Sequence, residues 1–184
     1  MWRADNFRRH IRTYHKGGIT AAASNGDEET VTWFLKKHPG YANEMEDGQS
    51  TPLCLAASKG HEKVVGLLLD NNADTEVECL MPKRVWGVTA LWEAMLERHY
   101  NVAKLLVCRG ADINVKYLGN TILNQVLRYC GDLDLVRLLL DRSADINFLK
   151  WFCSSGTALG FNLFAEKRLE AVKILLARGV DCHV

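Results

Sequence analysis

The sequence lacks the features that mark membrane-spanning and secreted proteins. No apolar run approaches the roughly 20 residues that a transmembrane helix needs. Its basic N-terminus is not followed by an apolar stretch, so we expect no secretory signal peptide. The six cysteines show no C-x-x-C spacing, which favours free thiols in a reducing compartment over a disulfide framework. We therefore expect an intracellular protein, cytoplasmic or nuclear, with no membrane partner.

Strong net charge and catalytic motifs are missing too. The net charge is +1, so no overall field points to nucleic acid or to an acidic surface. Residues 1–17 are an exception, because five basic residues against one acidic residue give this segment a charge of +4. The sequence contains no G-x-x-x-x-G-K-S/T, G-x-S-x-G or H-E-x-x-H motif. We expect no enzyme activity and no cofactor.

What the sequence does contain is an internal repeat. Four segments align on the marker threonines Thr51, Thr89, Thr121 and Thr157, which are separated by 38, 32 and 36 residues. The underlying period is about 33 residues, with short insertions. An incomplete copy precedes them at residues 18–43. The predicted repeats span about 18–46, 47–78, 86–115, 118–148 and 154–184.

Each repeat is predicted to form two helices joined by a polar break. The marker threonine can accept a backbone amide proton at the start of the first helix. Apolar residues recur at helical spacing. The second helices end at equivalent positions, Asn72, Gly110, Ser143 and Gly179. Gly or Asn there tolerates the left-handed backbone that stops a helix. Such a repeat cannot bury its apolar face alone, so neighbours must stack into a solenoid.

Three motifs together resemble the ankyrin repeat family: T-P-L-C at 51–54, S-K-G-H at 58–61, and A-D-I-N at 111–114 and 144–147. The resemblance covers about residues 18–184. It implies an all-α, ankyrin-type solenoid of about five helix-turn-helix repeats with short β-hairpin-like loops. It also implies a scaffold that binds another protein or peptide. His61 and His99, which occupy the family's usual His position before the second helix, are then expected to be structural.

The sequence departs from the family in one slot of each repeat. The family usually places His after T-P-L, where this chain has Cys54, Trp92, Asn124 and Gly160. We expect the hydrogen bonds of that His between neighbouring repeats to be missing. The third to fifth repeats should then be less regular than the second. Trp33 and Trp92 lie within helical motifs, and we expect them to pack in the core or between repeats.

Residues 3–17 resemble the C-terminal half of a two-cysteine two-histidine zinc finger. Phe7, His10, His15 and Gly17 follow that pattern. No cysteine precedes Cys54, so His10 and His15 would be zinc ligands only with upstream cysteines, and we expect no metal in this chain. Two interpretations stay open: a finger remnant of a nuclear regulator that binds DNA in a longer form, and a basic helix that flanks the first repeat. DNA binding by this chain alone would be weak and salt-dependent.

Ankyrin arrays bind their partners on the hairpin tips and the first helices, and the resemblance carries this face over to the present chain. The expected contact residues are Arg84, Trp86, Val88, Tyr117, Asn120, Trp151 and Phe152 on the tips, and Lys59, Glu97 and Arg128 on the first helices. Apolar residues at a tip are costly to expose, which favours a partner with apolar anchors and some acidic character. The alternative is that the loops fold back and bury their own aromatic residues.

The last repeat has no polar capping repeat after it in this sequence. Solenoid arrays need such caps for solubility, because an end repeat otherwise exposes its apolar face. Two explanations stay open: further repeats follow in a longer parent protein, or another chain covers this end. The second predicts self-association of this chain through its C-terminal repeat.

Overall fold

The structure is a computed structural model that describes residues 18–45, 50–80, 87–129, 132–145, 170, 171, 173–175, 177 and 178. The chain forms two compact units, Met1–Ala111 and Asp112–Val184. Within the described ranges, no helix is long and apolar enough to cross a membrane. The predicted basic helix at residues 1–17 lies outside these ranges, as does most of the predicted fifth repeat.

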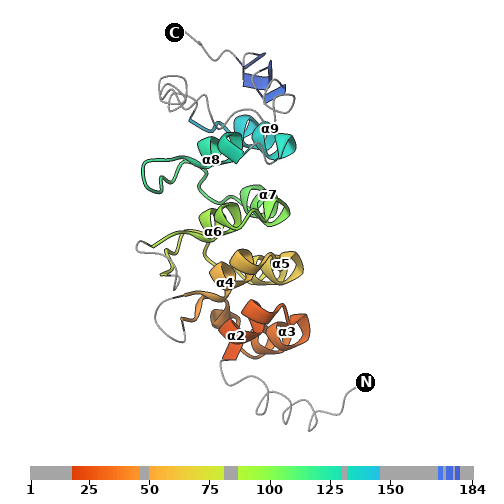
Figure 1. Ribbon diagram of the computed structural model, residues 1–184. Helices are drawn as coiled ribbons and strands as arrows, with labels where there is room; N and C mark the ends of the chain where they lie inside the picture. The colour runs from red at the N-terminus through yellow and green to blue at the C-terminus, as the bar shows by residue number, and fades with distance from the viewer. Residues whose placement is uncertain are drawn as a thin grey trace. The chain divides into compact units, whose positions relative to one another are not determined.

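Pairs of antiparallel helices build the first compact unit. Its elements are α2 (Gly18–Asn25), α3 (Glu28–Lys37), the 3-10 helix η1 (Pro39–Asn43), α4 (Pro52–Lys59), α5 (Glu62–Asp70), α6 (Ala90–Leu96) and α7 (Tyr100–Cys108). Helix α4 packs on both α2 and α6, and α5 packs on both α3 and α7 (Figure 1). First helices therefore stack on first helices and second helices on second helices, which confirms the predicted all-α ankyrin-type repeats.

The second compact unit continues the same pattern. Helix α8 (Ile122–Tyr129) packs against α9 (Leu133–Asp141). Arg178 donates a hydrogen bond to the Asp141 carboxylate over 2.5 Å. The first compact unit has an equivalent contact. There, Arg109 lies one residue after the end of α7 and contacts Asp70, the last residue of α5, over 2.7 Å. The chain around Arg178 therefore lies beside α9 as the second helix of a further repeat would.

Three second helices, α5, α7 and α9, end with the same backbone arrangement. After the second helices, the amides of Ala73, Ala111 and Ala144 donate to carbonyls five residues earlier, over 3.0 to 3.1 Å. The residues just before them have positive φ angles, which are 60° at Asn72, 92° at Gly110 and 62° at Ser143. These are Schellman-type ends, in which a left-handed residue closes the last turn. The predicted helix ends at these three positions are confirmed.

Asparagine side chains link consecutive repeats. The amide of Asp74 donates to Asn43 Oδ1 over 2.7 Å, and Asn43 Nδ2 donates to the carbonyl of Asn72 over 3.1 Å. In the second compact unit, the amide of Asp145 donates to Asn114 Oδ1 over 3.0 Å. Both acceptors precede their donors by 31 residues, about one repeat. The Asn of the A-D-I-N motif at Asn114 thus fixes the spacing of two repeats through their backbones.

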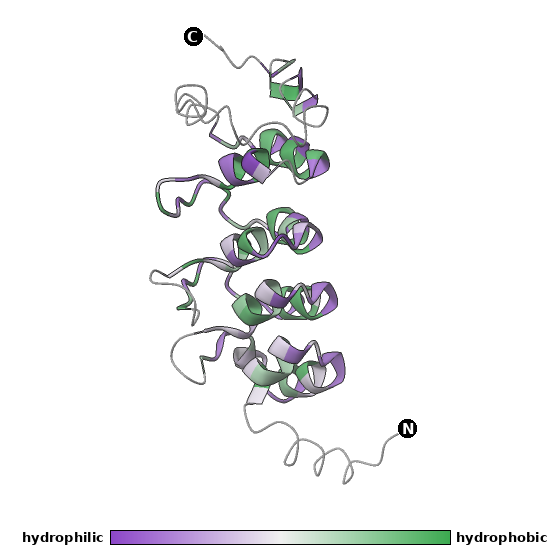
Figure 2. Cartoon of the chain, viewed as in Figure 1, coloured by the Kyte–Doolittle hydropathy of each residue, from purple (hydrophilic) through white to green (hydrophobic). Residues whose placement is uncertain are grey.

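The hydrophobic core lies between the paired helices and between successive pairs. Figure 2 shows hydrophilic residues along the outer side of the second helices, with hydrophobic residues turned inward. Among the described residues, Trp92 is the largest fully buried side chain, with 1% of its surface exposed, as expected for a core residue. Trp33 is only half-buried; its ring meets that of Phe34 edge-on at 5.1 Å, and Lys37 Nζ lies 4.3 Å from its centre.

The marker threonines cap their helices in two of the three described cases. Thr51 Oγ1 accepts the amide proton of Cys54 over 3.2 Å, and Thr121 Oγ1 accepts that of Asn124 over 3.3 Å. Thr89 Oγ1 is buried and has no hydrogen-bond partner among the described residues. The capping prediction is therefore confirmed at Thr51 and Thr121 and wrong at Thr89.

This difference predicts opposite results for one substitution. Thr121→Val removes an N-cap and should lower the free energy of unfolding by about 1 kcal/mol. Thr89→Val has the same shape change but removes a buried hydroxyl without a partner, so stability should stay the same or rise slightly. Urea unfolding followed by far-ultraviolet circular dichroism measures both. Equal losses in the two variants would mean that Thr89 is capped in solution.

Candidate functional site

A two-residue hairpin turn forms the tip at the start of the second compact unit. The amide of Tyr117 donates to the carbonyl of Asn120 over 3.0 Å, and the amide of Asn120 donates back over 2.9 Å. The central residues, Leu118 and Gly119, have φ angles of 49° and 75°. Two positive φ angles are typical of a type I′ turn, for which Asn-Gly is the preferred sequence. Leu118 thus occupies a position that favours a different residue.

Leu118 is unfavourable in two independent ways. Its left-handed backbone costs an L-residue with a Cβ roughly 1–2 kcal/mol. Its side chain is 68% exposed, the largest exposure among the large hydrophobic residues of the described ranges. Backbone strain and exposed apolar surface both concentrate at binding sites. Sequence reasoning placed a tip here without singling out Leu118, although Leu-Gly in place of Asn-Gly was the available signal.

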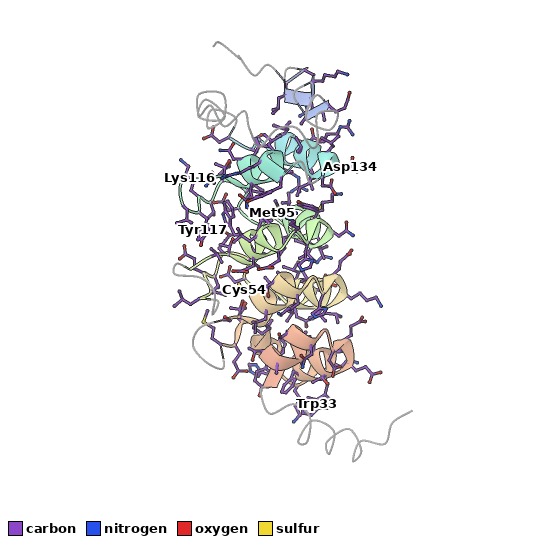
Figure 3. The ribbon with its side chains drawn as sticks, viewed as in Figure 1. Trp33, Cys54, Met95, Lys116, Tyr117 and Asp134 are labelled. Atoms are coloured by element: carbon purple, nitrogen blue, oxygen red, sulfur yellow. The ribbon has the colours of Figure 1, made fainter. Side chains whose placement is uncertain are left out.

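Cationic and aromatic residues accompany Leu118 in the second compact unit. Lys116 and Arg128 are exposed, and Tyr129, at the end of α8, is 44% exposed. Figure 3 shows Lys116 and Tyr117 on the hairpin side of this unit and Asp134, on α9, on the other side. Of the expected contact residues, Tyr117 and Asn120 are half-buried, because they form the bridge of the hairpin. The tip therefore offers one apolar side chain, with the exposed cation of Lys116 two residues before it.

The first compact unit holds three further expected contact residues, and one of them is misplaced. Lys59 and Glu97 are exposed at the C-terminal ends of α4 and α6, which pack on each other. Val88 is 2% exposed, and its backbone exchanges two hydrogen bonds with that of Cys79. The prediction that Val88 contacts a partner is wrong, because this bridge turns its side chain into the core.

The other four expected contact residues and the two histidines of the zinc-finger pattern lie outside the described residues. The contact residues are Arg84, Trp86, Trp151 and Phe152, and the histidines are His10 and His15. Among the described residues, no group of three or more His, Cys, Asp or Glu side chains could hold a metal ion.

The second helices carry ion pairs between repeats on the side away from the tips. Lys63, on α5, lies 3.3 Å from Glu28, on α3, in addition to the Arg109–Asp70 contact. These pairs are exposed, and such pairs contribute at most about 1 kcal/mol each. Their charges face a neighbouring repeat, which leaves the tips and first helices as the better candidate surface.

Comparisons with known proteins agree with this architecture. The model of three ankyrin repeats matches residues 19–117, and the single ankyrin repeat model matches residues 118–151. The chain is 31% identical to the ankyrin repeat domain-containing protein SAT10 of Stachybotrys chartarum over 174 residues, which is 94% of this chain and 8% of that protein.

Two other relatives combine ankyrin repeats with different parts. Identity is 30% over 131 residues to the mouse ankyrin repeat and SAM domain-containing protein 6, covering 70% of this chain and 14% of that protein. It is 32% over 124 residues to the E3 ubiquitin-protein ligase XBAT33 of Arabidopsis thaliana, covering 66% and 23%. The chain thus spans less than a quarter of each of these three relatives. Ankyrin repeats are generally protein-binding and non-enzymatic, and the matched models together with the stacked helix pairs show that this chain belongs to the ankyrin repeat family.

Proposed function

We propose that this chain is an interaction scaffold that binds a partner protein or peptide on its hairpin tips and first helices. The observation that carries the proposal is Leu118, an exposed apolar side chain on a strained turn. A partner pocket that covers Leu118 would remove its apolar surface from water, which favours binding by about 25 cal/mol per Å². The two backbone hydrogen bonds between Tyr117 and Asn120 hold the turn, and with it Leu118, in place before the partner arrives.

The charges near this tip point to the chemistry of the partner. Lys116 and Arg128 are exposed in the same compact unit as Leu118. Acidic groups on a partner, set beside an apolar pocket, would complement them and speed association. In the first compact unit, the exposed Lys59 and Glu97 are proposed contacts as well. Arg84, Trp86, Trp151 and Phe152 remain proposed contacts, which rest on the sequence alone.

One further proposal concerns a segment outside the described residues. The alternative function, a zinc-finger and ankyrin nuclear regulator, rests on Phe7, His10 and His15. It requires that a longer form supply the two missing zinc ligands and bind DNA.

Leu118→Asn separates binding from stability. Asparagine tolerates the left-handed turn position, so the variant should be more stable by about 0.5–1 kcal/mol. The same change removes the apolar anchor, so affinity for the partner should fall about tenfold or more. A partner is captured from an extract of the source organism, purified, and titrated against each variant by isothermal calorimetry, while thermal unfolding reports stability.

A matched pair of charge variants controls this test. Arg128→Ala removes a cation on the proposed face, whereas Arg137→Ala removes an exposed cation on α9 that pairs with Asp134 over 3.4 Å. The first should slow association, and the second should leave it unchanged. If Leu118→Asn raises stability and the affinity stays at the wild-type value, the tip is not the binding surface.

A further inference from the structure

Two cysteines meet inside the first compact unit. Cys54 lies in the first turn of α4, and Cys79 lies in the hairpin strand that leads toward α6. They are 25 residues apart in the sequence, but both sulfurs lie within 3.9 Å of the same backbone oxygen, the carbonyl of Val77. Both are buried, with 1% and 0% of their surfaces exposed. Figure 3 marks Cys54 within the stack.

Hydrogen bonds converge on the sulfur of Cys79. The backbone amide of Thr51 donates to Cys79 Sγ over 3.3 Å, and Thr51 Oγ1 lies 3.4 Å from the same sulfur. The Cys54 thiol completes this group. The carbonyl of Val77 lies 3.9 Å from Cys54 Sγ and 3.8 Å from Cys79 Sγ, so the two sulfurs lie next to the same backbone oxygen. The amide and hydroxyl of Thr51 therefore place two polar groups against a sulfur that is fully buried.

This geometry separates the acidities of the two thiols. The hydrogen bond from Cys54, with those from the Thr51 hydroxyl and amide, lowers the pKa of Cys79 to about 7, against the opposing effects of burial and Glu93. The pKa of Cys54 is raised by its hydrogen bond to Cys79 and by burial. Near neutral pH Cys79 therefore loses its proton more readily than Cys54. A thiolate is the nucleophilic form of cysteine.

We propose that Cys54 and Cys79 are a reversible dithiol–disulfide pair, in which Cys79 reacts with a peroxide and Cys54 resolves the product. The Cys79 thiolate attacks one oxygen of hydrogen peroxide, the O–O bond breaks, and hydroxide leaves, so that Cys79 becomes a sulfenic acid. Cys54 then attacks the Cys79 sulfur and forms the S–S bond. The departing hydroxide takes the Cys54 proton and leaves as water. In total, two thiols and one peroxide give one disulfide and two waters.

Three hydrogen bonds among the described residues hold the backbone around Cys79. Cys79 and Val88 exchange two backbone hydrogen bonds, and Ser50 Oγ donates to the carbonyl of Leu80 over 3.3 Å. Leu80, the next residue, is 48% exposed. Local opening of these contacts would admit peroxide to the buried sulfurs without unfolding the helices. The disulfide would then tie Cys79 to α4.

Peroxide treatment of the reduced full chain tests the proposal. After digestion, mass spectrometry should find a Cys54–Cys79 linkage as the first disulfide, and dithiothreitol should reverse it. In Cys54→Ser, Cys79 should instead accumulate as a sulfenic acid that dimedone traps. Cys108, exposed on α7, is the matched control, and Cys108→Ser should leave the linkage unchanged.

The pH dependence keeps the test decisive if a variant fails to fold. In the wild-type chain, the rate of Cys79 modification should rise with a midpoint near pH 7, and not near the value of about 8.5 for an ordinary cysteine. The proposal is overturned if the folded chain forms no Cys54–Cys79 linkage at a peroxide dose that oxidises Cys108. A midpoint of 8.5 or above for Cys79 would overturn it as well.

Discussion

Replacing Trp92 with alanine should lower the free energy of unfolding by about 3–5 kcal/mol, the usual loss for a buried tryptophan. Trp92 lies on α6 and is 1% exposed. It is the third residue after the marker threonine Thr89, the position at which the family usually has His. Helix α6 packs on both α4 and α7, so the cavity would weaken two helix contacts at once. The free energy of unfolding of a typical domain is only about 5–15 kcal/mol, so this one substitution would remove a large part of the stability.

Trp33→Ala is the matched control for this experiment. It removes the same side chain from α3, where the ring is half-buried and contacts Phe34 and Lys37. The loss there should be clearly smaller, because less surface leaves the protein interior. Urea unfolding is followed by far-ultraviolet circular dichroism, since either variant changes the tryptophan fluorescence. A loss for Trp92→Ala no larger than that for Trp33→Ala would show that Trp92 is not part of the core.

The sequence could predict the local structure because that structure depends on nearby residues. Helical spacing of apolar residues predicted the helix pairs, and Asn72, Gly110 and Ser143 predicted where second helices end. Such signals act within one or two turns of helix, where propensity and capping dominate. Trp92 was assigned to the core for the same reason, since it lies in a strongly apolar helical motif.

Contacts between repeats and hairpin register were beyond that reasoning. Val88 was expected on the surface, because hairpin position does not reveal which residue pairs with Cys79 and turns inward. The contact of Cys54 with Cys79 joins residues in different elements, and no spacing rule marks it. The sequence marks Leu118 only as a residue type that a tight hairpin turn disfavours at this position. The inward position of Val88 depends on the alternation of side chains along a strand, which a one-residue shift in register would reverse. The Cys54–Cys79 contact depends on how the hairpin packs against α4.

Gly60→Ala should lower the free energy of unfolding by roughly 2–4 kcal/mol, from backbone strain and steric overlap together. Gly60 ends α4 with a φ angle of 75°, a left-handed conformation that alanine adopts at a cost. A Cβ at this position would lie 2.5 Å from Nδ1 and 2.7 Å from Cε1 of His99 in the next repeat. The His99 ring would have to move away from the start of α7. The same arrangement joins Gly26 to His61, whose Nε2 lies 3.0 Å from the carbonyl of Ser24.

Gly110→Ala separates the two causes, because Gly110 also has a left-handed backbone, with a φ angle of 92°, while its added methyl meets no atom of the described residues within 4 Å. Its loss should be the strain alone, about 1–2 kcal/mol. Introducing Gly60→Ala into a His99→Ala background should cost the same amount, because the overlapping ring is gone. If the cost of Gly60→Ala is unchanged in that background, His99 does not set the spacing between these repeats. If the cost falls as expected, the pairing of Gly and His across repeats explains why this family position is structural, and why it needs no catalytic or metal-binding role.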